Sequence, residues 1–327
     1  MVIQVSESSQ IGEARRKAAA LAETRLGTAR GGDVALATTE LATNLVKHGK
    51  GGHILVQPLQ NGNCGLRIMG VDKGPGIRDF SRALSDGQST AGSLGGGLGA
   101  IRRICDSFEF YSVPDSGTVV SAEFWGGKVE SPTRAPILAG VVSEPVRGED
   151  ACGDGWGMRT SQNEVTLMVV DGTGHGILAS EAAREAERVL SGTKGESLSD
   201  IVHDTHAALK KTRGAAFAVA RIRPEAGLLS FVGVGNISAS ILTGNQSRSM
   251  VSHHGIVGQH MERVQEFSCP WDRDSILVMH SDGLATRWDL EHYPGIRNKP
   301  PSMIAAVLHR DFYRGRDDVT VLAAKAA

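Results

Sequence analysis

The chain has 327 residues, of which 40% are hydrophobic and 22% are charged, and its formal net charge is -1. This composition is ordinary for a globular protein of roughly two domains, and the near-zero net charge gives no global field that would attract nucleic acid or an anionic membrane. Four scattered cysteines without a CxxC pair argue against a zinc site or a disulfide framework, and no stretch approaches about 18 uninterrupted apolar residues, so we expect a cytoplasmic protein.

The chain is expected to begin with a short strand at residues 2–5 and two amphipathic helices. The first helix is predicted over residues 10–27, with Ser8 or Ser9 as its N-cap. Residues 1–10 do not read as a signal peptide.

The second helix is predicted over residues 33–48, with Asp33 as its N-cap. Glu40 and Asn44 lie four residues apart on it and therefore share one face. In isolation, such a pair is simply the polar side of an amphipathic helix.

Glycine-rich turns follow this helix in a fixed order. Strands are predicted at residues 53–59 and 64–71, joined by a turn at 61–63, and the second strand leads into Asp72-Lys73-Gly74-Pro75-Gly76. The segment LGGGLG precedes another helix, and glycines before a helix expose backbone N–H groups that can bind phosphate. Neither the Walker pattern nor the dinucleotide GxGxxG is present, so the ordered set ExxxN, DxGxG, GGGLG and Gly117-Thr118 is the informative signal.

This ordered set resembles the GHKL (Bergerat) ATP-binding fold, and within it the serine kinases of bacterial partner-switching pathways, namely the anti-sigma-factor kinases and especially the stressosome switch kinases. The resemblance covers residues 1–126 and implies an α/β sandwich. It implies an ATP site formed by Asn44, Asp72, Gly74, Gly76, Gly95, Gly97, Gly99 and Thr118. In that site Asn44 would bind Mg²⁺, Asp72 would contact the adenine amino group, and Glu40 would be the catalytic acid beside the attacking hydroxyl.

A short linker is predicted at residues 127–136, because this segment has no apolar period and contains two prolines. The second domain is expected to span residues 137–327. It opens with an apolar segment at residues 137–146. Strands are predicted at residues 156–161, 165–170, 215–222, 227–234, 238–242, 248–252, 263–268, 274–280 and 319–323, with helices at 178–190, 197–212 and 301–309. Many antiparallel strands with a pair of helices among them indicate an α/β sandwich and not a parallel sheet.

Acidic residues in this half fall beside apolar strand segments. Asp171 ends the run VTLMVVDGTGHG, and Asp154, Asp282 and the pair Asp317-Asp318 have similar settings. One Asp-Gly is usually a turn, but four such settings favour a site for Mg²⁺ or Mn²⁺, which take oxygen ligands. Two such ions roughly 3.5–4 Å apart can direct a water molecule at a phosphate, and we find no convincing Cys/His or Ser/His/Asp arrangement that would serve instead.

The motifs GD, DGxGHG, SDGL and RDDVTVL, in this order, resemble the metal-dependent type 2C (PPM) protein phosphatases of the sporulation stage II E branch. The segments FVGVGNISASIL and CGDGW are most similar to the stressosome feedback phosphatases. The resemblance implies an α-β-β-α sandwich with metal ligands Asp154, Asp171, the Gly172 carbonyl, Asp282 and Asp317. Asp171 is also taken as catalytic, Asp318 as a neighbouring residue and His175 as a turn residue. No arginine clamp for the substrate phosphate is expected, and Arg147 is unsupported in that role.

The two resemblances together predict a fused switch enzyme that uses ATP, Mg²⁺ and Mn²⁺. One half would phosphorylate a serine or threonine on a STAS-type anti-anti-sigma or stressosome-like partner, and the other half would remove that phosphate. Two alternatives stay open: an N-terminal half that only binds ATP and regulates a phosphatase, and a scaffold that is inactive in both halves. We expect no nucleic-acid or membrane partner and a possible homodimer.

Overall fold

The computed structural model describes residues 1–60, 64–79, 84, 97–127, 136–161, 163–193 and 197–327. The turn predicted at residues 61–63, Gly95 and most of the predicted linker at 127–136 lie outside these ranges. The chain divides into two compact units, Met1–Thr133 with Tyr293–Lys299, and Arg134–His292 with Pro300–Ala327. No helix among the described residues has both the length and the apolar character needed to cross a membrane.

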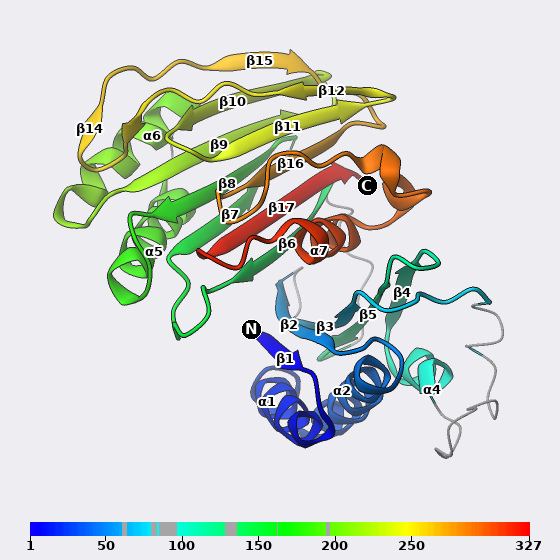
Figure 1. Ribbon diagram of the computed structural model, residues 1–327. Coiled ribbons are helices and arrows are strands. Elements are labelled where there is room, and N and C mark those ends of the chain that lie inside the picture. The colour runs from blue at the N-terminus through cyan, green and yellow to red at the C-terminus, as the bar shows by residue number, and fades with distance from the viewer. Residues whose placement is uncertain (61–63, 80–83, 85–96, 128–135, 162, 194–196) are drawn as a thin grey trace. The chain divides into compact units, whose positions relative to one another are not determined.

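The first unit is a five-stranded antiparallel sheet with its helices packed on one face (Figure 1). The strand order is β1 (Val2–Val5), β2 (Gly52–Gln60), β3 (Cys64–Asp72), β5 (Thr118–Trp125) and β4 (Ser107–Ser112). Helices α1 (Ser8–Leu26), α2 (Thr28–Lys47) and α4 (Gly97–Ile104) contribute to one core with this sheet. Fully burying an aliphatic side chain contributes about 1.5–3 kcal/mol, so this shared apolar face holds the unit together.

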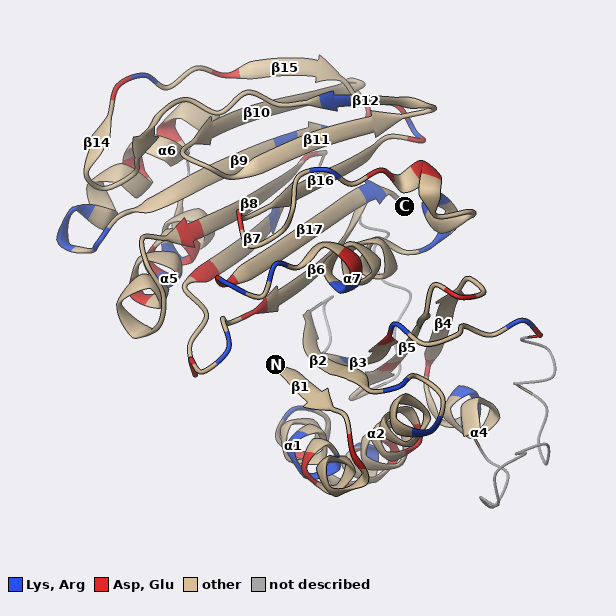
Figure 2. Cartoon of the chain, in the orientation of Figure 1, with Lys and Arg blue, Asp and Glu red and all other residues tan. Residues whose placement is uncertain are grey.

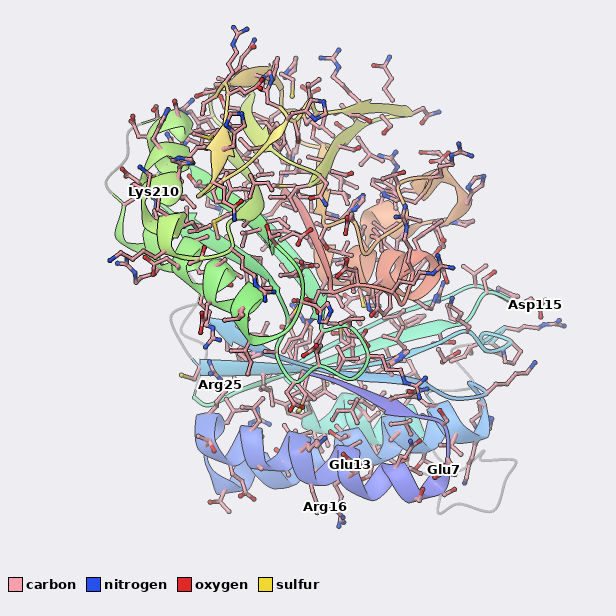
Figure 3. All side chains as sticks on the ribbon, turned by 60° about the vertical axis from the view of Figure 1, so that its left-hand side comes forward. Glu7, Glu13, Arg16, Arg25, Asp115 and Lys210 are labelled. Carbon is pink, nitrogen blue, oxygen red and sulfur yellow. The ribbon has the colours of Figure 1, made fainter. Side chains whose placement is uncertain are left out.

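Both N-terminal helices begin elsewhere than the sequence predicts. The N-cap of α1 is Glu7, which forms a reciprocal capping box with Gln10, so the prediction of Ser8 or Ser9 is wrong. Glu7 lies at one end of the helix and Arg25 near the other (Figure 3). Helix α2 starts at Thr28 and not at Asp33, because Arg30 in its first turn is anchored to the carbonyls of Ile104 and Trp125.

The second unit contains two five-stranded antiparallel sheets packed face to face (Figure 1). One sheet has the order β15 (Phe267–Pro270), β10 (Leu228–Val234), β9 (Ala215–Arg223), β8 (Val165–Gly172) and β7 (Asp154–Thr160). The other has the order β12 (Gln246–Ser249), β11 (Ser238–Thr243), β16 (Ile276–His280), β17 (Val319–Ala326) and β6 (Ile137–Glu144). Helices α5 (Ile177–Gly192) and α6 (Leu198–Ala208) pack on the first sheet, and α7 (Pro301–Phe312) packs on β6 and β17.

Strand β8 shows why the central strands have continuous apolar sequences. Val165, Leu167 and Val169 face the core between the two sheets, whereas Met168 and Val170 face α5 and α6. Because both faces of the strand are buried, period-two alternation disappears and an unbroken aliphatic run remains. The predicted pair of α/β sandwiches is therefore confirmed, and the second is an α-β-β-α sandwich.

Short edge elements of this unit were predicted less well. All four residues of β12 are exposed, so its sequence has no buried face and the predicted bounds 248–252 are shifted. The hairpin β13 (Gly255–Ile256) and β14 (His260–Met261) was not predicted, and β15 begins at Phe267 and not at residue 263. Two-residue strands are too short to leave a periodic pattern.

Candidate functional site

Helix α2 presents Glu40 and Asn44 at the border of its buried face. Both side chains are half-buried, while Leu41 and Leu45 beside them are buried in the core. The Asn44 carbonyl accepts the N–H groups of His48 and Gly49 at 2.8 and 3.1 Å, which ends the helix there. No side chain in the described part of the chain forms an ion pair or hydrogen bond with the Glu40 carboxylate. That carboxylate is therefore able to accept a hydrogen bond from a substrate hydroxyl.

Asp72 ends β3 in a network of backbone hydrogen bonds. Its Oδ1 accepts the N–H of Gly74 at 2.8 Å and the N–H of Thr118 at 3.2 Å. Thr118 is the register partner of Asp72 across the β3–β5 pair, so the sheet itself aligns the two residues. The predicted support of Asp72 by Thr118 thus uses the Thr118 backbone.

The Thr118 side chain binds Ser112, which the sequence analysis did not identify. The two hydroxyl oxygens are 3.0 Å apart, and Ser112 Oγ also accepts the N–H of Ile77 at 2.8 Å. Ser112 and Thr118 are register partners across the β4–β5 pair. Ser112 therefore joins the segment that follows Asp72 to the strand that holds it.

The glycines of this site allow close backbone approaches. Gly76 has a φ of +68°, and a Cβ there would lie 2.3 Å from the Val113 carbonyl oxygen, so a side chain does not fit. A Cβ on Gly74 would lie 2.8 Å from Gly49 Cα. Gly97 and Gly99 lie in the first turn of α4, as expected of a phosphate-binding loop, and Gly95 lies outside the described residues.

Four acidic residues of the second unit meet at one rim of the sandwich. Asp154 and Asp171 are direct register partners across β7 and β8. Asp282 follows β16 and Asp317 precedes β17, and these two strands are antiparallel neighbours. Acidic segments accordingly lie at the ends of β8 and β17 in Figure 2.

These carboxylates repel one another in a partly buried setting. Burial and the charge of Asp171 hold the pKa of Asp154 well above its usual range, although the Ser281 hydroxyl donates to Asp154 Oδ2 at 2.6 Å. Burial, Asp282 and Asp317 raise the pKa of Asp171 to about 7. No lysine or arginine among the described residues forms an ion pair with any of the four acids. A divalent cation would supply the missing positive charge.

The donor set fits Mg²⁺ or Mn²⁺, because it offers carboxylate and carbonyl oxygens without sulfur or imidazole. The residues that would hold the ions are Asp154, Asp171, the Gly172 carbonyl, Asp282 and Asp317. Within the described ranges, no group of three or more acidic, histidine or cysteine side chains is placed closely enough to hold a metal ion as it stands.

Two uncharged side chains hold these acids in place, and neither was assigned a role from the sequence. Asn236 Nδ2 donates to Asp282 Oδ2 at 2.7 Å, and a hydrogen bond from Asn236 partly offsets the raised pKa of Asp171. Ser281 donates to Asp154 and accepts the Thr320 N–H at 2.9 Å. Asn236 lies in the segment FVGVGNISASIL, which was singled out as a motif, so the signal was present without its geometry.

Asp317 and Asp318 are adjacent in sequence but differ in their surroundings. Asp317 is exposed, whereas Asp318 is 3% exposed and accepts the N–H groups of Val146 and Gly153 at 2.7 and 2.8 Å. Asp318 thereby fixes the segment that leads into Asp154.

Three other titratable residues of this region are His175, Arg147 and Cys152, and each has a simple structural setting. His175 Nδ1 lies 2.7 Å from Glu149 Oε1, a contact that holds the turn after Gly172. Arg147 is exposed. Burial raises the pKa of the Cys152 thiol to about 12, so it stays protonated and is not an activated nucleophile.

Two protein-family models match the chain. Residues 5–124 match a model described as a histidine kinase-like ATPase domain. Residues 161–327, about half of the chain, match the model of stage II sporulation protein E.

Curated relatives match each half separately. The serine/threonine-protein kinase RsbT of Bacillus subtilis (strain 168) is 38% identical over 104 residues, which span 32% of this chain and 78% of RsbT. The phosphoserine phosphatase RsbX of the same organism is 24% identical over 138 residues, which span 42% of this chain and 69% of RsbX.

Solved structures match the second unit. A structure from work on the bacterial stressosome, described as a modular system adapted to control secondary messenger signalling, has a TM-score of 0.55 at 26% identity over 58% of this chain and 99% of that chain. RsbX in complex with magnesium has a TM-score of 0.52 at 22% identity over 58% of this chain and 96% of that chain, which shows a shared fold.

Proposed function

The chain belongs to the stage II sporulation protein E family through its C-terminal half and to the RsbT-type serine/threonine kinases through its N-terminal half, and on this premise we propose that both halves act on one phosphorylation site of a partner protein. Residues 1–126 would add the phosphate from ATP, and residues 137–327 would remove it. The single observation behind this proposal is that one chain contains a carboxylate suited to orient a hydroxyl and a separate rim of four converging acids.

In the kinase half, the chain's own residues would bind and orient the reactants. Asp72, fixed by the Gly74 and Thr118 N–H groups, would hold the adenine, and Asn44 would hold Mg²⁺. Glu40 lies one turn before Asn44 and would accept the hydrogen bond of the attacking hydroxyl. Bound Mg²⁺ would supply charge neutralisation of the phosphates.

In the phosphatase half, Asp154, Asp171, Asp282, Asp317 and the Gly172 carbonyl would hold Mg²⁺ or Mn²⁺. The metal would supply Lewis acidity and water activation. Asn236 and Ser281 would keep the acids in position, and Asp318 would hold the backbone before Asp154.

The partner is proposed to be a folded STAS-type or stressosome-like phosphoprotein in the cytoplasm. Exposed aliphatic side chains beside both sites support docking of a protein surface. Ile177 and Leu178, in the first turn of α5 after the Gly172 turn, are 67% and 49% exposed, and Leu36, one turn before Glu40, is 45% exposed. Ile177 and Leu178 are adjacent, and contiguous exposed apolar residues are typical of protein contact surfaces.

The test is phosphate transfer from labelled ATP to a co-encoded STAS-type protein, with Mg²⁺ and Mn²⁺, by the natural chain, Asp171→Ala and Glu40→Gln. Label is expected to accumulate on the partner with Asp171→Ala, and not with Glu40→Gln even though ATP binding is retained. Labelling of the partner by the double variant Glu40→Gln/Asp171→Ala that equals the labelling by Asp171→Ala alone would contradict the kinase role. Hydrolysis of the phosphorylated partner at the same rate by Asp171→Ala would contradict the phosphatase role.

A further inference from the structure

Arg213 lies beside the turn that follows Asp171. It belongs to the basic turn Lys210-Lys211-Thr212-Arg213, which leads from α6 into β9, and Lys210 is labelled there in Figure 3. The Arg213 guanidinium Nη1 lies 3.1 Å from the point that a Cβ on Gly174 would occupy. Gly174 is only two residues after Gly172, whose carbonyl is a proposed metal ligand.

The backbone around Arg213 is held firmly against that turn. Gly214 C=O accepts the Thr173 N–H at 2.9 Å, and Arg213 C=O accepts Gln259 Nε2 at 2.6 Å. Gly172 is paired with Ala215 in the β8–β9 register. Strand pairing, and not chance packing of a surface side chain, therefore determines which residue stands beside Gly174.

Gly174 lies between Arg213 and the acidic rim. Its carbonyl oxygen is 3.3 Å from the Cβ position on Gly153, the residue before Asp154. Gly174 also has a φ of +89°, which disfavours any side chain. A side chain at this position would be strained and would displace the guanidinium, so glycine is what lets Arg213 lie against this turn.

The Arg213 guanidinium is exposed, and no carboxylate among the described residues is within ion-pair distance of it. Three arginines of this unit do have such partners: Arg188 pairs with Glu185, Arg223 with Glu164 and Arg310 with Asp311. Arg248 on β12 has none among the described residues either, so it is the position of Arg213 beside the turn after Asp171 that sets it apart. A planar guanidinium can donate two parallel hydrogen bonds to a phosphate, which makes it well suited to an anionic group held beside an acidic metal site.

We propose that Arg213 binds the phosphate of the phosphorylated substrate and so sets the affinity of the phosphatase half for phosphomonoester dianions. This inference rests on the proposed phosphatase function. It replaces the expectation from the sequence that no arginine contacts the substrate phosphate. The sequence could not identify Arg213, because it is about 40 residues from Asp171 and reaches the turn only through the β8–β9 pairing.

The test uses the full chain with Mn²⁺, a phosphoserine peptide as substrate and inorganic phosphate as competitive inhibitor. The variants are Arg213→Ala and Arg213→Lys, with Arg248→Ala as the matched control, since Arg248 is an exposed arginine on the remote edge strand β12. Arg213→Ala is expected to raise the KM and the inhibition constant of phosphate in parallel by about tenfold or more, with kcat changed far less. Arg213→Lys keeps the positive charge but not the two parallel donors, so it is expected to recover only part of this affinity, and Arg248→Ala is expected to match the natural chain.

Mn²⁺ affinity, measured by calorimetry on the same proteins, separates phosphate binding from damage to the metal turn. It is expected to be unchanged in Arg213→Ala. A KM and phosphate inhibition constant equal to those of the natural chain, an equal effect of Arg248→Ala, or a parallel loss of Mn²⁺ affinity would each overturn the role of Arg213. No metal-dependent hydrolysis by the natural chain would instead overturn the proposed phosphatase function itself.

Discussion

The two candidate sites differ in how their carboxylates are stabilised. Asp72 in the first unit accepts the Thr118 N–H, which strand pairing delivers, and the Gly74 N–H from the turn that follows it, so backbone donors organise the proposed adenine end of that site. Asp154 and Asp171 in the second unit face each other across a strand pair, and the side chains of Ser281, Thr320 and Asn236 are their neutral hydrogen-bond partners among the described residues. The backbone thus holds the carboxylate of the first site in place, whereas the acids of the second repel one another, which is why we propose that the second site needs a cation.

Asp171→Asn is expected to produce the largest effect. It should lower metal-dependent hydrolysis and raise the stability of the metal-free protein. It removes a proposed metal ligand, so metal-dependent hydrolysis should fall by more than the roughly 10–100-fold that outer ligand partners typically cost. It also removes a repelling buried charge, so the metal-free protein should become more stable above pH 7. Hydrolysis of a phosphoserine peptide and urea unfolding without metal check the two expectations, and a stability loss in the metal-free variant would contradict the charge argument.

The metal-free protein should lose stability as the pH rises from about 4 to about 7. The pKa of Asp171 is raised from 3.8 to about 7, and that of Asp154 is raised as well, so the folded state binds protons that the unfolded chain releases. This contribution is fully present below the unfolded pKa and is lost as the pH passes the folded pKa, with a total on the order of a few kcal/mol. Saturating Mg²⁺ should cancel the trend, since a cation favours the ionised acids.

Tryptophan fluorescence can follow this transition in the second unit. Three of the four tryptophans, Trp156, Trp271 and Trp288, belong to it. The midpoint of urea unfolding measured by this signal without metal should be lower at pH 8 than at pH 5.5, and Asp171→Asn should reduce the difference. A midpoint that rises with pH in the metal-free protein would contradict the assignment of raised pKa values.

A smaller loss is expected from Asn236→Ala. Asn236 donates to Asp282 and to Asp171, so its removal should leave the two acids less well positioned and weaken Mn²⁺ binding by roughly 10–100-fold. Asn163→Ala is a matched control, because Asn163 Nδ2 donates to Glu225 at 3.1 Å on the surface. Calorimetric titration with Mn²⁺ measures both variants, and equal affinities would argue against a positioning role for Asn236.

The sequence predicted local features of both sites and missed those that depend on pairing between distant segments. Asp171 and Asp72 end apolar runs that are recognisable without a structure, and the two-domain α/β class followed from the order of such runs. Ser112 and Asn236 are ordinary polar residues in their local sequence. They acquire a role only when β4 pairs with β5 and when the end of β10 meets the end of β16.

The start of α2 was predicted wrongly for the same reason, because it depends on contacts between segments that are distant in the sequence. Two glycines in its first turns disfavour a helix locally, which made Asp33 the natural N-cap in the sequence. Arg30, however, is bonded to the carbonyls of Ile104 and Trp125, and its guanidinium lies over the Phe124 ring at 5.8 Å. Tertiary contacts made by one side chain therefore outweigh the local preference of the segment.

The smallest effect is expected in the site around Asp72, where backbone groups of the protein already donate hydrogen bonds to the carboxylate. Ser112→Ala removes the hydroxyl that bonds to Thr118 and to the Ile77 N–H, but leaves both backbone donors to Asp72 intact. Loss of one such contact costs about 1 kcal/mol, so ATP affinity should fall only about fivefold. Ser230→Ala is the matched control, because it breaks a hydroxyl pair of the same 3.0 Å length with Ser268 in the other unit.

Titration with a fluorescent ATP analogue measures the ATP affinity of both variants. The size of the fall in affinity for Ser112→Ala decides whether the two sites differ in the way described above. A fall of a hundredfold or more for Ser112→Ala would mean that the network around Asp72 is a cooperative unit in which one hydroxyl holds several groups in place. A fall of about fivefold, beside no change for Ser230→Ala, would show that the backbone donors alone keep Asp72 in position. The proposed adenine site would then tolerate loss of a side-chain partner. In the metal-free acidic rim, by contrast, each neutral donor should matter more, because no lysine or arginine of the described residues pairs with its four acids.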